Sequence, residues 1–401
     1  MIGYSSRIGR RGFLKAGLLA GGGALLGCQG ASPESDAPAG PDVRLPEDCA
    51  DPFVGGALLG TVAFIGEGDP TMETLTGDGL DGRLYTDLSA LGPDDLVTPT
   101  ERFYVRTRAS ALLDFEAPVS LTIGGLTEAP VTLTLQDLAP LITPQGRHLL
   151  ECSGNTGKAH FGLMSVGEWA GVSFGDLMKA VVRLPGATQA LVSGFDTYPA
   201  PSVKSTPGAS WVFTFAQLES AGAFFATELN GEPLPDDHGR PLRLLVPNWY
   251  GCTCIKWVRE VTLVDDSEPS TPHMREFAQR THQVGVPELA SDYLPATLDQ
   301  AAMPIRVEVW QVGAQVLHRV VGILWGGYSV TAKLVIRFAP EEEYVPVDIC
   351  PAHAANDPWT LWSHAWTPPG PGTYAIQLQT SDPSVPKKRL DSGFYARTVT
   401  V

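Results

Sequence analysis

The sequence predicts an α+β protein in which a mixed domain is followed by an antiparallel β-sandwich of immunoglobulin type. Two observations predict this order. Between residues 51 and 300, helix-like and strand-like patterns are interspersed without the regular strand–helix alternation of a parallel sheet. From residue 301 onward, short β-rich runs are separated by Gly, Pro and Asp turns and show no helical period. We therefore expect residues 51–300 to form the first domain and residues 301–401 to form the sandwich.

Residues 1–27 have the features of an export signal. Arg10 and Arg11 open the run RRGFLK, which matches a twin-arginine signal, and the Gly/Ala/Leu run after it is too short to span a bilayer as a stable helix. The run LLGC then places Cys28 at a lipoprotein processing box, although a chance cysteine near an ordinary cleavage site is the alternative. We expect a periplasmic or other extracytoplasmic protein that is anchored by lipid on Cys28 and does not span its membrane.

Residues 28–50 predict a flexible tether, because they are rich in Pro, Ala, Ser and Asp and have almost no large apolar side chains to bury. The chain carries a net charge of −16, and loss of the four cationic residues of 1–27 makes it −20. Such acidity argues against nucleic acid as a partner. It would attract a basic partner such as a small cytochrome, although solubility alone is the plainer explanation.

The first domain is predicted to contain short strands and a capped helix. Alternation of Val119, Leu121 and Ile123 is typical of a half-buried strand that ends at a glycine turn. Ser173, with Asp176 three residues later, predicts the start of a helix over 173–182. Further strands are expected at residues 131–135, 191–195 and 242–246.

The sandwich is predicted from about seven β-rich runs, a number typical of immunoglobulin-type sheets. These runs are residues 305–310, 316–324, 330–338, 344–349, 360–366, 373–379 and 395–401.

Cys152 is the most informative single residue. It lies in the run LECSGN, and no second cysteine lies within the two-to-four-residue spacing of a zinc site. It is therefore either a small buried core residue, the commoner fate of a free cysteine, or a lone thiolate that binds a ligand. Four other cysteines, Cys49, Cys252, Cys254 and Cys350, allow three disulfide connectivities, and a bridge between Cys252 and Cys254 would be strained.

Cys152 belongs to one of five separated segments that we consider together. They are TPTERFYVR (98–106), LECSGN (150–155), WAGV (169–172), ELNGEPLPDDHGRPLR (228–243) and YGCTCIKW (250–257). Together they resemble the sulfite oxidase family of molybdenum enzymes, over most of residues 96–401. The order of a mixed domain before a sandwich also resembles that family, in which the sandwich mediates dimerisation.

The resemblance implies a molybdenum–molybdopterin cofactor with Cys152 as the protein ligand to the metal. It implies that Arg106 faces the substrate, and it places further residues at the cofactor: Phe103, Arg108, His238, Arg243, Gly251 and Lys256. A histidine, two arginines and a lysine suit an anionic pterin phosphate. An ordinary surface role for Arg108 and a core role for Trp169 are the alternatives to cofactor or pocket contacts.

Departures from the family pattern bear on the substrate. Thr156, Thr227 and Thr253 stand where sulfite-oxidising relatives place arginines or a tyrosine, and Thr107-Arg108 stands where Asn-His is usual. A dianion such as sulfite needs convergent positive charge. With Arg106 as the one usual arginine left, tight sulfite binding is not expected, and a less charged acceptor fits equally well.

The sequence thus predicts a molybdopterin oxidoreductase that performs two-electron oxo transfer on a small oxyanion or sulfur compound. A sulfoxide or N-oxide reductase on the same fold is the rival enzyme. A non-catalytic, lipid-anchored binding or scaffold protein is the rival of another class. No CxxCH haem-attachment motif occurs, so we expect no c-type haem in the chain and an external carrier, such as a cytochrome, for the electrons.

Overall fold

A computed structural model describes residues 51–93, 96–109, 113–115, 120–196, 208–327, 333–347 and 358–401. All of them belong to one compact unit, Leu45–Val401. The predicted signal and tether, with Cys28 and Cys49, lie outside the described residues, as does Cys350. No helix in the described part is long and apolar enough to cross a membrane.

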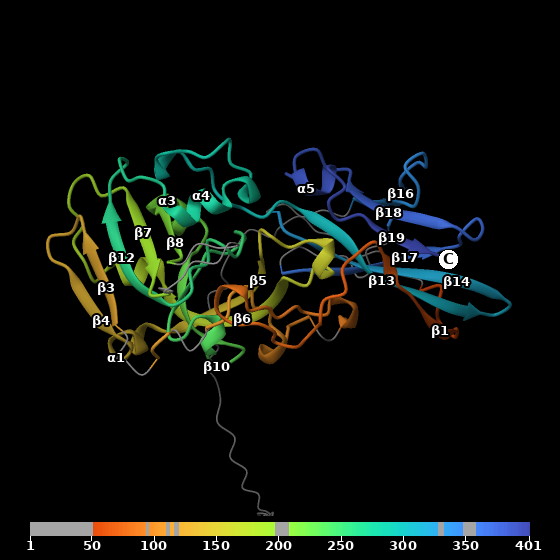
Figure 1. Cartoon of the computed structure of the whole chain (residues 1–401), viewed down its shortest axis with the longest axis horizontal. Coiled ribbons are helices and arrows are strands. Elements are labelled where there is room, and N and C mark those ends of the chain that lie inside the picture. Colours follow the sequence, from red (N-terminus) through yellow and green to blue (C-terminus); the bar gives the residue numbers. More distant parts are fainter. Residues whose placement is uncertain are drawn as a thin grey trace, which may run out of the picture. The chain divides into compact units, whose positions relative to one another are not determined.

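The first domain is built on two five-stranded sheets (Figure 1). One has the order β4-β3-β12-β7-β8, in which β12 and β3 form a parallel pair and the other neighbours are antiparallel. Its strands are β3 (Ser120–Gly125), β4 (Val131–Thr134), β7 (Gln189–Gly194), β8 (Ser210–Thr214) and β12 (Val258–Val264). The strands predicted near 119–123, 131–135 and 191–195 are therefore confirmed.

The second sheet has the order β10-β9-β6-β5, with β11 also paired to β9. Its strands are β5 (Thr143–Glu151), β6 (Met164–Ser173), β9 (Phe224–Leu229), β10 (Glu232–Pro233) and β11 (Arg243–Leu245). Its longest pairing joins β5 to β6 and ends where Glu151 faces Met164. Cys152 follows directly, so the candidate metal ligand lies at the end of a fully paired strand.

Helices in this domain are short and begin at side-chain caps. They are α1 (Leu135–Leu138), α2 (Phe174–Met178), α3 (Phe215–Ser220) and α4 (Pro272–Phe277). Ser173 accepts a hydrogen bond from the backbone N–H of Asp176, which confirms the predicted cap of α2. The helix ends earlier than residue 182, because Val181 and Val182 are β-branched and Pro185 follows soon after.

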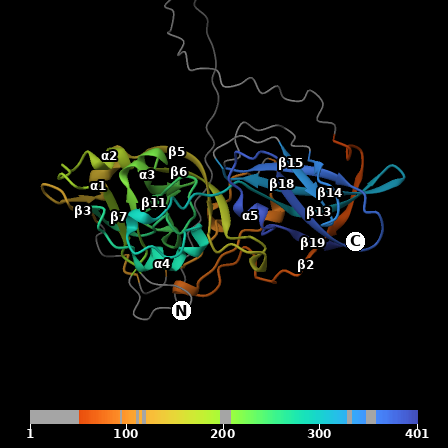
Figure 2. The same ribbon diagram turned by 90° about the horizontal axis from the view of Figure 1, so that it is seen from above.

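All seven predicted sandwich strands are present, in two sheets that Figure 2 shows from above. They are β13 (Ala301–Val312), β14 (Gln315–Trp325), β15 (Leu334–Arg337), β16 (Val345–Pro346), β17 (Thr360–Trp366), β18 (Thr373–Thr380) and β19 (Arg397–Thr400). A short helix, α5 (Lys388–Asp391), precedes β19.

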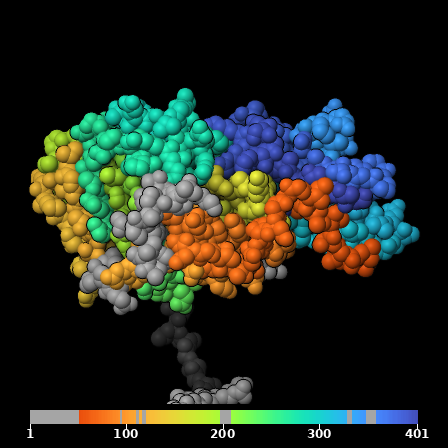
Figure 3. Space-filling view, viewed as in Figure 1, coloured from red at the N-terminus to blue at the C-terminus, as the bar shows by residue number. Residues whose placement is uncertain are grey.

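The sandwich also recruits two strands from the start of the described chain. The strand β1 (Ala57–Val62) pairs with β13, and β2 (Phe64–Ile65) pairs with β19. The sequence prediction had placed these residues in the first domain. The difference arises because local pattern does not reveal which sheet edge a strand will cover. Figure 3 shows this segment, in orange, beside residues of both the first domain and the sandwich.

Apolar packing joins the first domain to the sandwich. One buried cluster combines Leu149 and Met164 of the first domain with Ile305 and Trp325 of the sandwich. The indole N–H of Trp325 also donates to the buried carboxylate of Glu151 at 3.0 Å, and the Tyr395 hydroxyl donates to it at 2.9 Å. The residue before Cys152 is thus bound by side chains of the sandwich.

Glu67, which follows strand β2, forms a buried ion pair with Arg397 of β19, and this pair gives a stability prediction. Both carboxylate oxygens of Glu67 lie 2.7 Å from the Arg397 guanidinium, whose side chain is 4 % exposed. Glu67→Ala leaves that cation buried without its partner, so urea unfolding should show a loss of about 3–5 kcal/mol. The control is Glu168→Ala, which breaks a 2.7 Å pair with Arg147 that is half exposed, and should cost at most about 1 kcal/mol. Equal losses in the two variants would contradict this account.

Candidate active site

Cys152 lies in a tight, fully hydrogen-bonded turn after β5. Its backbone N–H donates to the carbonyl of Leu163, and its own carbonyl accepts from the N–H of Asn155, both at 2.9 Å. The Asn155 side chain accepts from the N–H of Leu163, and the N–H of Gly154 approaches the Cys152 sulfur at 3.4 Å. The thiol is 4 % exposed, yet it lines a cavity in the first domain. The turn therefore fixes one sulfur atom at the wall of a pocket.

The cavity is lined by residues from separate parts of the chain, which the fold brings together around that sulfur. They include Leu80, Tyr104, Arg106, Thr107, Cys152, Asp196, Asp237, His238, Arg243, Gly251, Cys252, Cys254, Lys256, His273 and Phe277. Of the predicted site residues, the structure places Cys152, Arg106, His238, Arg243, Gly251 and Lys256 at this one cavity.

Two cations, Arg243 and Lys256, line the cavity. Arg243 is 5 % exposed and donates to the carbonyl of His238 at 3.3 Å, while its Nε atom has no hydrogen-bond partner. The ammonium of Lys256 donates to the carbonyls of Thr107 and Asp237. In the described part of the chain, neither cation forms an ion pair with a carboxylate. Both charges are therefore held by neutral carbonyl oxygens.

Mutual repulsion and burial shift the pKa values of this group. Burial and the neighbouring Arg243 lower the pKa of Lys256 well below its usual value. Burial, Arg243 and Lys256 lower the pKa of His238 to about 3, so its ring is neutral. Asp196, also in the lining, has its pKa raised by burial to about 6. Arg106, Arg243 and Lys256 therefore share the cavity with the carboxyl groups of Asp196 and Asp237, and none of these three cations forms an ion pair among the described residues.

Arg106 contributes another cation near the thiol, and a second arginine supports it. The Arg83 guanidinium donates to the carbonyls of Leu80, Gly82 and Arg106, and Arg106 donates to the same Leu80 carbonyl at 3.3 Å. Burial and Arg106 lower the pKa of Arg83 to about 10. Nothing in the quoted motifs pointed to Arg83, because it precedes them by fifteen or more residues.

Two of the predicted cofactor residues do not reach the cavity wall. Arg108 is partly exposed, donates to the carbonyl of Gly77 at 3.0 Å and lies 3.7 Å from Asp237. This is the surface role that the sequence left open. Phe103 is fully buried, with its ring centroid 5.4 Å from that of His238. It supports the histidine from behind.

Trp169 and Gly251 serve the site through packing. Trp169 is 2 % exposed and lies 5.8 Å from the Arg243 guanidinium, behind the cavity lining, as its core alternative predicted. A Cβ atom at Gly251 would lie 2.6 Å from the Tyr104 hydroxyl, so only glycine fits there.

Cys252 and Cys254 are both free thiols. Tyr104, which lies within the segment TPTERFYVR, and Asp196, which lies in none of the motifs, also line the cavity.

The donor set fits a metal that brings its own ligands. Among the described residues, no group of three or more His, Cys, Asp or Glu side chains gathers as a metal site. A soft metal could therefore be held by the single thiolate of Cys152 only together with ligands from a bound cofactor. The unpaired guanidinium Nε of Arg243 and the buried ammonium of Lys256 fit an anionic cofactor group such as a phosphate. These observations fit a molybdopterin.

Comparison with known proteins gives the same cofactor. Residues 113–272 match the model of the oxidoreductase molybdopterin binding domain. The chain is 26 % identical to an NADPH nitrate reductase of Fusarium oxysporum over 71 % of its length and 30 % of that protein's. It is 24 % identical to the mitochondrial sulfite oxidase of Macaca fascicularis, over 59 % of the chain and 49 % of that protein. The chain thus spans half or less of these relatives.

A solved structure shows a similar fold along most of both chains. The sulfane dehydrogenase SoxCD of Paracoccus pantotrophus aligns with a TM-score of 0.59 over 87 % of this chain and 86 % of that one. The two sequences are 18 % identical, so the likeness concerns the fold alone.

The depressed pKa of His238 gives a pH prediction for the cofactor-free protein. Between about pH 3 and the ordinary histidine value of about 6.5, the unfolded chain binds a proton at this residue and the folded chain does not. The contribution of His238 to the free energy of unfolding therefore falls by about 1.4 kcal/mol for each pH unit below 6. Urea unfolding at pH 6.5 and pH 4.5 should show a smaller pH dependence for His238→Gln than for the wild type. The other titrating groups contribute equally to the two proteins, so their effects cancel in this comparison. The same pH dependence of the free energy of unfolding in both proteins would refute the lowered pKa of His238.

Proposed function

Because the chain belongs to the sulfite oxidase family of molybdopterin-binding oxidoreductases, we propose that it catalyses two-electron oxo transfer on a small oxyanion or sulfur compound. One observation carries the proposal. The Cys152 thiol lines a cavity together with Arg106, Arg243 and Lys256, and no carboxylate pairs with these cations in the described residues. A thiol beside unbalanced positive charge suits a metal cofactor with an anionic tail.

In this proposal Cys152 binds the metal as a thiolate, and the bound cofactor supplies the oxo-transfer chemistry. Arg243 and Lys256 hold the phosphate of the pterin through charge-assisted hydrogen bonds. Neutral His238 offers either a donor or an acceptor to the pterin ring. The protein thus contributes binding, orientation and local charge.

Arg106 is proposed to orient the substrate. Its backbone carbonyl is held by Arg83, and its guanidinium shares the Leu80 carbonyl with Arg83, so its position is fixed before substrate arrives. A guanidinium fixed in this way stabilises developing negative charge on an oxygen without reorganisation. Arg106 is therefore assigned to the substrate side of the cavity and Arg243 to the cofactor side.

The direction of the reaction is tested by two half-reactions on one preparation. The chain's relatives include proteins named as sulfite oxidases and as nitrate reductases, so both directions belong in the test. We expect sulfite to reduce added cytochrome c with a high KM, because Arg106 is the one usual family arginine that remains. Reduced viologen dye with a sulfoxide or N-oxide should turn over much more slowly. Faster dye oxidation would assign the protein as a reductase, and a metal-loaded protein inactive in both assays would be a binding protein.

Replacement of the thiol tests the metal ligand. Loss of outer-shell partners of a metal site costs roughly 10–100-fold in activity, so Cys152→Ser should lose more than about 100-fold in turnover. Its molybdenum absorption bands should change as well. Cys252→Ser is the matched control, because this thiol lines the same cavity but burial raises its pKa and keeps it protonated. A Cys152→Ser protein with full activity and an unchanged spectrum would exclude the mechanism.

We further propose a location and partners from the sequence. The RRGFLK run and Cys28 support twin-arginine export and a lipid anchor, which suits a protein that folds around its cofactor before export. An external carrier such as a cytochrome would take up or deliver the electrons. The sandwich is the proposed dimerisation surface.

A further inference from the structure

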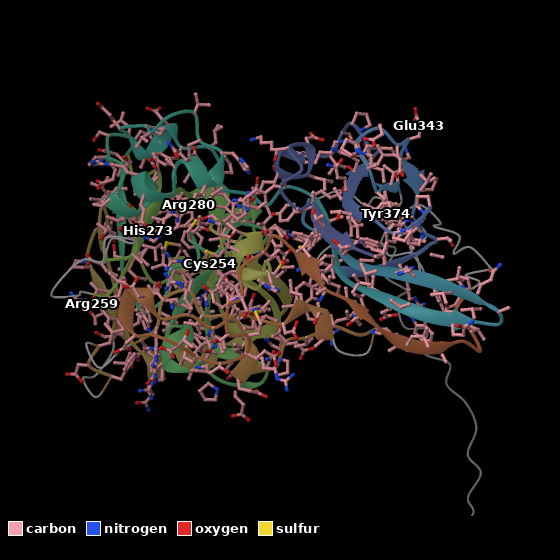
Figure 4. All side chains as sticks on the ribbon, turned by 45° about the vertical axis from the view of Figure 1, so that its right-hand side comes forward. Cys254, Arg259, His273, Arg280, Glu343 and Tyr374 are labelled. Atoms are coloured by element: carbon pink, nitrogen blue, oxygen red, sulfur yellow. The ribbon has the colours of Figure 1, made fainter. Side chains whose placement is uncertain are left out.

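Arg280 lies beside the turn that carries Cys152, just outside the residues that line the cavity, and it comes from outside every motif that identified the site. It belongs to the single turn Gln279–Thr281, which follows α4. The helix α4 contributes His273 and Phe277 to the cavity wall. Figure 4 labels Arg280 and His273 near each other on the first domain. These residues lie beyond residues 113–272, the part of the chain that matches the family model.

The Arg280 guanidinium and the Cys152 thiol both lie beside Gly154. A Cβ atom at Gly154 would lie 3.6 Å from Arg280 Nη1 and 3.8 Å from Cys152 Sγ. Gly154 itself donates its N–H toward that sulfur at 3.4 Å. Because Gly154 has no side chain, nothing at this position separates the cation from the thiol.

The backbone of Arg280 is attached to the cysteine turn. One guanidinium nitrogen of Arg389, Nη2, donates to the carbonyl of Ser153 at 2.8 Å and to the carbonyl of Arg280 at 3.1 Å. The Arg280 guanidinium rests 5.3 Å from the ring centroid of Phe277, and the Thr281 hydroxyl donates to the Phe277 carbonyl at 3.0 Å. Arg280 is therefore held at a fixed place relative to Cys152.

The Arg280 charge is available to a ligand. The side chain is exposed, and it forms no ion pair with a carboxylate among the described residues. Exposed charges are screened by water, but an anion that enters the cavity beside Cys152 would meet Arg280 where water is being displaced. A guanidinium at that point can donate two parallel hydrogen bonds to an oxyanion.

We propose that Arg280 is a substrate-binding residue that works together with Arg106, and that the substrate is an anionic oxyanion rather than a neutral sulfoxide or N-oxide. The absence of arginine at residues 156 and 253 argued against an anion. Arg280 supplies that charge from a different part of the chain. This inference rests on the proposed function, because it assigns the substrate side of the same site.

Sulfate, an unreactive oxyanion, is the probe for the test. Calorimetric titration of the molybdenum-loaded protein with sulfate should give an affinity about tenfold weaker for Arg280→Gln than for the wild type. Arg280→Lys should recover part of the loss because it keeps the charge. Arg259→Gln is the matched control, since Arg259 is an exposed arginine of β12 that Figure 4 labels away from Arg280. Its sulfate affinity should equal that of the wild type.

Kinetics supply the second measurement. For an anionic substrate, Arg280→Gln should raise KM about tenfold with kcat little changed, and KM for a neutral sulfoxide should not move. Unchanged sulfate affinity in Arg280→Gln, or no sulfate binding to the wild type, would overturn the inference.

The two proposals fail in different ways. Sulfate binding does not require turnover, so it reports on Arg280 even if every substrate assay is negative and the proposed function falls. Normal turnover with unchanged sulfate affinity would remove the role of Arg280 and leave the proposed function intact.

Discussion

The buried carboxylate of Glu151 is the contact on which the arrangement of the site depends. It is 1 % exposed and is bound by Trp325 and Tyr395, with Arg389 3.7 Å away, and all three belong to the sandwich. Its backbone carbonyl accepts from the N–H of Gly251, which begins the loop that carries Lys256. Cys152 is the next residue. Removal of any one partner would leave charge or polarity unsatisfied in the interior, which is far more costly than loss of an exposed contact. The sandwich therefore holds the thiol in place as well as packing against the first domain.

The second constraint is the positive charge beside that thiol. A buried cation without an ion-pair partner is costly to fold, and carbonyl oxygens reduce this cost here, together with the Asp196 and Asp237 carboxyl groups near Lys256. A ligand with a phosphate would relieve the repulsion between Arg243 and Lys256. Binding of such a ligand would then stabilise the fold by mass action. The repulsion between Arg243 and Lys256 thus destabilises the cofactor-free protein and also favours the binding of an anionic cofactor.

Much of the fold and part of the site could be predicted from the sequence because the signals are local. Ser173 and Asp176 meet within one turn, and seven strands carry their own turn residues. The pairing of β1 with β13 could not be predicted, since it joins residues about 250 positions apart. The site shows the same division. The motifs located Cys152 and Arg243, whereas tertiary packing alone brings Arg280 beside the turn that carries Cys152. The motif position of Arg108 did not reveal that Asp78 and Asp237 would lie within 4 Å of its side chain, and its contact with the cofactor stays a prediction.

The central claim is that this cavity holds a molybdopterin with Cys152 as the metal's protein ligand. The most direct measurement is the molybdenum and pterin content of protein purified from a host that makes molybdopterin, with metal by mass spectrometry and pterin by fluorescence after oxidation. The account predicts about one molybdenum and one pterin per chain, with both lost together when the buried cations Arg243 and Lys256 are replaced by glutamine. Protein that folds stably in such a host with neither molybdenum nor pterin would contradict it.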